Sequence, residues 1–262
     1  MRRTAATIAH ERVRAPATAA ADGGVGWLAE SLALFRKDVR AELRTKTALS
    51  SVGLFTFSAL LLLGLATAQL KGITIPTPDG EGSRPAWDSP GKMALLWVLF
   101  IFAAFAGLAH SFVHEEETGT ITALRLSMTP EAVFAGKLLF NLTVLLGVMV
   151  VMTPIYIGIT DMGIGQPIVF ALMMGGGGFG LAASATIVAA LTAKADGAGA
   201  LYGALGLPIL VVFLTLLLNA ANTLYTVNAP MIRIVKDIGG LLSYGVMLVT
   251  LSAVLFQFVW ED

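Results

Sequence analysis

Uncharged apolar stretches of about twenty residues recur along the chain, and they constrain its fold more than any other feature. A helix of that length is long enough to cross a hydrocarbon core of roughly 30 Å. Apolar residues make up 56% of the 262 positions and charged residues 13%, which is about half the charged share of a typical soluble domain. The sequence therefore predicts an all-α integral membrane protein. The expected transmembrane helices are six: 50–70, 93–112, 138–159, 167–191, 200–220 and 240–259.

Composition also excludes several classes of function. The formal net charge is zero, so nothing points to nucleic acid as a partner. Cysteine is absent, which excludes disulfides, thiolate metal sites and cysteine nucleophiles. No GxxxxGK[ST] motif is present, so any ATP must bind to another subunit. The last four expected spans carry no ionisable group beyond their ends, which argues against an ion-coupled carrier and against an intramembrane enzyme. We expect neither catalytic residues nor a directly bound cofactor.

The distribution of basic residues predicts the orientation. Six spans place both termini on one side of the membrane. Basic residues gather on that side just before the first span, at Arg36, Lys37, Arg40, Arg44 and Lys46. By the positive-inside rule this side is the cytoplasm. Residues 1–26 are expected to be a disordered cytoplasmic extension, and 27–262 a single membrane domain. The segment 71–92, rich in proline and glycine, is expected to be an irregular loop on the opposite side.

The segment 27–46 predicts an amphipathic helix ahead of the first span. Its apolar residues recur at helical spacing and its basic residues fall largely elsewhere, as expected for a helix lying in the membrane interface. The basic residues in question are Arg36, Lys37, Arg40 and Arg44. Two roles are open, a simple anchor and an elbow that also meets a cytoplasmic partner.

The segment that joins spans two and three, 110–137, is the most informative one. It begins with three glutamates, continues past a helix-breaking glycine, and then carries apolar residues before a threonine and a proline that can open the next helix. A short cytoplasmic helix there is too apolar to stand alone and suggests docking of a partner protein, whereas a plain connecting loop is the alternative. The residues concerned are Glu115, Glu116, Glu117, Gly119, Thr120, Ile121, Leu124, Leu126 and Pro130.

Two further features have more than one interpretation. His110 and His114 share a helical face and could bind a metal or lie near haem, but without a third ligand they are more typical of polar residues at a helix end. The glycines 175–178 and Gly180 permit either close helix packing or a flexible break.

Three segments resemble the permease subunit of the bacterial haem-exporter ABC transporter, the cytochrome c maturation protein B (CcmB) family. They are FRKDVRAELRTKTAL before span one, EETGTITALRLSMTP after span two, and TAKADGAGALYGALGLPILVVF at span five. The resemblance covers the chain from about Leu32 onward. The chain departs from the usual pattern in three ways. Thr122 stands where the family has glutamate, and the loop before span five carries only Lys194 as a basic residue, beside Asp196. The N-terminal extension and the first external loop are longer than usual.

The resemblance implies a function in cytochrome c maturation. Such a permease forms a homodimer in the bacterial inner membrane and pairs with two copies of a cytoplasmic ATPase (CcmA-like), with a haem-handling membrane subunit (CcmC-like) and a small membrane subunit. The segment from Glu115 to Pro130 would be the coupling helix seated on the ATPase. Hydrolysis would release a haem-loaded chaperone or export haem, the possible cargo. The alternatives are an ABC permease that exports a drug, lipid or polysaccharide, and a membrane scaffold that transports nothing.

Overall fold

The computed structural model describes residues 26–70, 72–76, 83–85, 88–108, 126–192, 198–226 and 229–261. Within this part of the chain, seven helices and one short antiparallel hairpin make up the fold. The extension expected at 1–26 lies almost wholly outside the described residues. The elements are α1 (Gly26–Thr45), α2 (Thr47–Gln69), β1 (Thr74–Pro76), β2 (Ser83–Pro85), α3 (Ser89–Leu108), α6 (Pro130–Thr160), α7 (Pro167–Thr192), α8 (Ala198–Tyr225) and α9 (Met231–Glu261).

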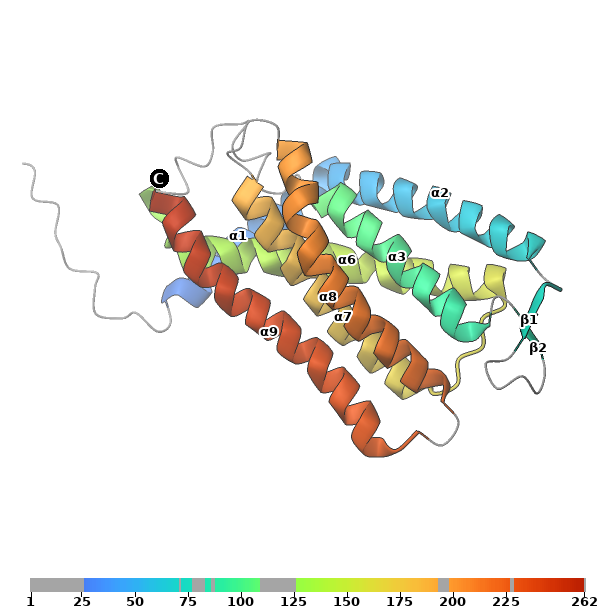
Figure 1. Ribbon diagram of the computed structural model, residues 1–262. Helices are drawn as coiled ribbons and strands as arrows, with labels where there is room; N and C mark the ends of the chain where they lie inside the picture. Colours follow the sequence, from blue (N-terminus) through green and yellow to red (C-terminus); the bar gives the residue numbers. More distant parts are fainter. Residues whose placement is uncertain are drawn as a thin grey trace, which may run out of the picture.

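The helices from α2 onward form an elongated bundle, with α1 at one end and the β1–β2 hairpin at the other (Figure 1). Helix α7 packs against α6, α8 and α9, while α2 packs against α3 and α6. The C-terminus lies at the same end of the bundle as α1 (Figure 1).

Five of the described helices are long and apolar enough to cross a membrane. Their apolar segments are Leu49–Gln69, Pro130–Thr160, Pro167–Ala189, Pro208–Tyr225 and Met231–Phe256. Helix α3 carries the shorter apolar segment Ser89–Phe105. Large apolar side chains such as Leu62, Val150 and Ile168 point outward from the bundle, as expected where lipid is the solvent. The protein is therefore a helical, multi-pass membrane protein.

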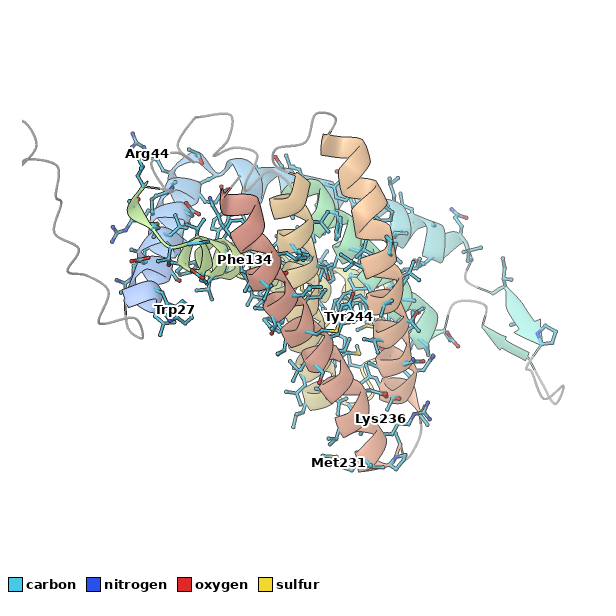
Figure 2. The ribbon with its side chains drawn as sticks, turned by 60° about the vertical axis from the view of Figure 1, so that its left-hand side comes forward. Trp27, Arg44, Phe134, Met231, Lys236 and Tyr244 are labelled. Atoms are coloured by element: carbon cyan, nitrogen blue, oxygen red, sulfur yellow. The ribbon has the colours of Figure 1, made fainter. Side chains whose placement is uncertain are left out.

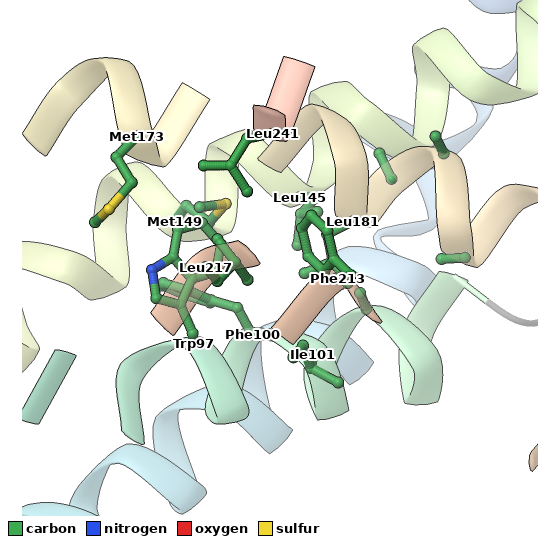
Figure 3. Packing of buried hydrophobic residues seen from close by; sticks show 14 of the residues in the cluster. Trp97, Phe100, Ile101, Leu145, Met149, Met173, Leu181, Phe213, Leu217 and Leu241 are labelled. Atoms are coloured by element: carbon green, nitrogen blue, oxygen red, sulfur yellow. The ribbon is translucent and has the colours of Figure 1, made fainter. Parts of the chain in front are cut away.

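The core lies between α3, α6, α7, α8 and α9, and the fully buried Trp97 is its largest side chain (Figure 3). The rings of Trp97 and Phe100 meet edge to face with centroids 6.2 Å apart. Gly177 on α7 lies against this cluster, and a Cβ there would stand 2.3 Å from the Trp97 ring and 2.9 Å from Leu217. Helix α7 runs without interruption through the glycines. Of the two roles open for this glycine run, the structure shows close packing and no break.

Several helices extend beyond their expected spans, and one expected loop contains a hairpin. Helix α9 begins at Met231, ahead of the expected start at 240: Arg233, Lys236 and Asp237 interrupt the apolar residues of its first turns, although the segment from Met231 is apolar enough on average to cross a membrane. Helix α6 begins at Pro130, the residue predicted to open it, and so extends ahead of the expected span 138–159 and carries Lys137. The segment 71–92, expected to be irregular, contains a hairpin in which Thr74 pairs with Pro85 and Pro76 with Ser83.

Candidate functional site

The expected interface helix is present as α1, and the four basic residues singled out from the sequence lie on it. Arg36, Lys37, Arg40 and Arg44 are exposed. Figure 2 shows Trp27 and Arg44 at the two ends of α1, with Phe134 of α6 beside them, while Met231 and Lys236 lie at the far end of the bundle. The helix predicted from the sequence is confirmed; its place in the membrane interface stays a prediction.

Most of the expected coupling segment lies outside the described residues. This applies to Glu115, Glu116, Glu117, Gly119, Thr120, Ile121 and Leu124, and to His110 and His114. The end of the segment is described. There the side chain of Leu126 is 86% exposed, and Pro130 occupies the first turn of α6, as the sequence predicted.

A polar seam joins α1 to the beginning of α6, and we define it by Glu30, Asp38, Thr129 and Lys137. At its outer end, the backbone N–H and the hydroxyl of Thr129 both donate to Glu30 Oε2, each at 3.2 Å. Thr129 is the extended residue that precedes α6, and its own side chain does not cap that helix. Instead, the Glu30 carboxylate lies at the beginning of α6, where the positive end of the helix dipole favours an anion.

The inner part of the polar seam is a buried ion pair. Lys137 Nζ lies 3.0 Å from Asp38 Oδ2, with the two side chains 5% and 8% exposed. The contact is electrostatic rather than a well-aligned hydrogen bond. Lys37 approaches the other oxygen of the same carboxylate at 3.4 Å, but its side chain is half exposed. A charge this buried is tolerable only beside its counter-charge, so the pair fixes α1 on α6.

Close backbone approach brings these groups together. A Cβ on Gly136 would stand 3.0 Å from the Ser31 carbonyl oxygen and 3.0 Å from Leu34 Cδ2. Ser31 and Leu34 are themselves buried on the face of α1 that carries Asp38. Glycine at 136 therefore lets α1 lie directly on α6, next to Lys137.

The junction between α1 and α2 is equally compact. Lys46 alone separates the two helices, and it adopts a left-handed conformation with φ 55°. The Glu42 carboxylate accepts a hydrogen bond from the Leu49 N–H at 2.7 Å, across this turn. The chain thus changes direction within one residue, and α1 is held both to α2 and to α6.

One polar contact lies deeper in the bundle, one turn of α6 beyond the seam. Asn141 Nδ2 donates to Thr186 Oγ1 of α7 at 2.9 Å, and both side chains are fully buried. Within the described ranges, no group of three or more His, Cys, Asp or Glu residues could hold a metal ion. The described polar contacts link α1 to α6 and α6 to α7.

Sequence reasoning missed the seam residues. The available signal was a lysine directly after a glycine inside an otherwise apolar run, AVFAGKLLF. No protein-family model matches the sequence, and no curated protein is significantly similar to it.

Proposed function

We propose that the protein is the membrane permease subunit of an ATP-driven ABC transporter complex for haem handling in cytochrome c maturation, as the resemblance to the CcmB family implies. A separate cytoplasmic subunit would hydrolyse the ATP. Support comes from the matching segments before span one, after span two and at span five. The multi-pass helical fold is compatible with such a subunit.

The observation that carries the proposal is the polar seam, which holds the beginning of α6 to α1. A partner that moves the coupling segment at Leu126 would pull on Thr129, three residues further along the chain. Thr129 is held by Glu30 of α1. Eight residues further along α6, the Asp38–Lys137 pair ties the same two helices together. Motion at the exposed segment would therefore move α1 and α6 as one body. This is what coupling to an ATPase requires, by a hinge-type transition.

The proposed topology has six spans and both termini in the cytoplasm. Helix α3 supplies the sixth span: its 20 residues give a length of about 30 Å, which matches a hydrocarbon core. The basic residues of α1 then lie on the cytoplasmic side. Because the chain has no cysteine, single cysteines can test this arrangement. Thr45→Cys should be protected from an impermeant maleimide in intact cells and Gly163→Cys labelled; the reverse pattern would invert the topology.

The partner assignment is tested at the exposed end of the coupling segment. An 86%-exposed leucine that becomes buried in an interface contributes about 1.5–3 kcal/mol, so replacement by aspartate should weaken binding at least tenfold. We expect Leu124→Asp/Leu126→Asp to lose the co-purifying ATPase while inserting normally in the membrane. Ile164→Asp, in the turn between α6 and α7 at the opposite end of the bundle, is the matched control and should keep it. Equal recovery of ATPase with both variants would remove the coupling role from this segment.

A further inference from the structure

Helix α1 carries three distinct faces along its length. The first is packed on α6 and contains Ser31, Leu34 and Asp38. The second lies about 120° around the helix, at 100° per residue, and contains the exposed side chains of Leu28, Leu32 and Leu43. Within the described part of the chain, α6 packs on the first face, and the leucine side chains of the second face are exposed.

The third face is basic and lies about 90° beyond the leucines. Arg36, Arg40 and Arg44 follow one another at intervals of four residues, which aligns them along one side of the helix, and all three are exposed. A row of guanidinium groups in this arrangement matches phosphate groups spaced along a surface. The leucines and the arginines together form a surface that we call the α1 surface: Leu28, Leu32, Leu43, Arg36, Arg40 and Arg44.

The position of α1 along the bundle sets the depth at which this surface lies. Helix α1 contacts Thr129, just before α6, and Gly136 and Lys137 within it. The remainder of α6, residues 138–160, is about 35 Å long, enough to cross a bilayer. At its other end α1 passes through Lys46 into α2, whose apolar segment begins at Leu49. Both neighbours thus enter the hydrocarbon where α1 lies. We expect the α1 surface to lie at the bilayer boundary, with its leucines toward acyl chains and its arginines toward headgroups.

We propose that the α1 surface is a binding site for anionic phospholipids. Charge complementarity selects the headgroup, since three aligned arginines favour lipids with a net negative charge over zwitterionic ones. The polar seam adds fixed orientation: Asp38 and Lys137 hold the opposite side of α1 to the bundle, so the arginines face the headgroups without having to be ordered by the lipid. This inference rests on the membrane fold alone and stands independently of the transport function proposed above.

The test uses the full chain with a single cysteine carrying an environment-insensitive fluorophore. The probe sits at Leu32→Cys on the α1 surface, and a reference probe sits at Leu61→Cys, exposed in the middle of α2. Each protein is reconstituted in equimolar phosphatidylcholine and phosphatidylglycerol, with one lipid at a time brominated near the top of its acyl chain. The ratio of quenching by the two brominated lipids measures the local lipid preference.

We expect brominated phosphatidylglycerol to quench the Leu32 probe about five times more effectively than brominated phosphatidylcholine. At the Leu61 probe the ratio should be close to one. In Arg36→Gln/Arg40→Gln/Arg44→Gln the ratio at the Leu32 probe should also fall to about one. The matched variant Arg233→Gln/Lys236→Gln, which removes two exposed basic side chains at the far end of the bundle, should leave the ratio unchanged. Salt of about 1 M, where the Debye length is about 3 Å, should lower the preference without any substitution.

Three results would overturn the proposal. Equal quenching by the two lipids at the Leu32 probe would show that the α1 surface does not select anionic lipid. A preference that survives loss of the three arginines would show that these residues do not carry it. A Leu32 probe that neither lipid quenches, while the Leu61 probe is quenched normally, would show that protein covers this surface, either a second copy or another subunit.

Discussion

Removing the ammonium group of the buried Lys137 should destabilise the protein far more than removing that of the exposed Lys37, although both approach the same carboxylate. In Lys137→Met the Asp38 side chain, 8% exposed, loses its buried partner at 3.0 Å and keeps only the half-exposed Lys37 at 3.4 Å. Breaking a buried pair in this way costs about 3–5 kcal/mol. At about 2–4 °C per kcal/mol for a chain of this size, even the lower figure lowers the melting temperature by about 6–12 °C.

Lys37→Met is the matched control, because it removes the same kind of group from the same carboxylate. Lys37 Nζ lies 3.4 Å from Asp38 Oδ1, but its side chain is half exposed to solvent. Pairs of that kind contribute about 1 kcal/mol or less, so the melting temperature should fall by no more than about 4 °C. The measurement is thermal unfolding of the full chain in mild detergent, followed by circular dichroism.

The double variant Asp38→Leu/Lys137→Met separates charge from shape. Replacing both members of a buried pair by apolar residues removes the unpaired charge, so at least half of the lost stability should return. If Lys137→Met and Lys37→Met have the same melting temperature, the Asp38–Lys137 pair does not hold α1 in place. If the double variant is as unstable as Lys137→Met, the cost comes from packing, and the electrostatic explanation is wrong.

Three further predictions concern helix packing and follow from the same unfolding measurement. Gly136→Val should lower the free energy of unfolding by about 1–3 kcal/mol, because its side chain would separate α1 from α6, whereas Gly147→Val on the same helix, with no atom within 4 Å of the added Cβ, should change it by less than about 1 kcal/mol. Gly177→Val should lower the free energy of unfolding by about 3 kcal/mol or more, because its side chain would collide with the core. Its control is Gly175→Val, where the added Cβ meets nothing within 4 Å. Equal effects within either pair of variants would refute the packing argument. Asn141→Leu should cost about 1 kcal/mol by removing the buried hydrogen bond to α7, and an unchanged or higher stability would mean that this bond contributes nothing.

The sequence predicts the membrane-crossing helices well, because lipid as a solvent imposes a length and a polarity on each of them. The apolar stretch expected at 50–70 corresponds to α2, and that at 167–191 to α7. Prediction is weaker where a helix continues beyond the hydrocarbon. The first turns of α9 carry Arg233 and Lys236 and still belong to one continuous helix, which an apolar stretch alone does not reveal.

The amphipathic helix α1 was also predictable, since its apolar residues recur at helical spacing. The contact of α1 with α6 was not predictable. Asp38 falls on the side of α1 that meets α6, and nothing in the local pattern links it to a lysine about a hundred positions later. Contacts of this kind depend on the tertiary arrangement, and Gly136 makes the approach possible only because it stands opposite Ser31 and Leu34.

The most direct test of the proposed function is to identify what co-purifies with the protein from native membranes in mild detergent, by mass spectrometry. A permease for cytochrome c maturation predicts a soluble ATPase with a Walker motif together with a haem-binding membrane subunit. An ATPase without any haem protein would instead indicate a general ABC exporter and contradict the haem assignment. Recovery of the protein without any ATPase, under conditions that preserve other transporter complexes, would contradict the permease function itself.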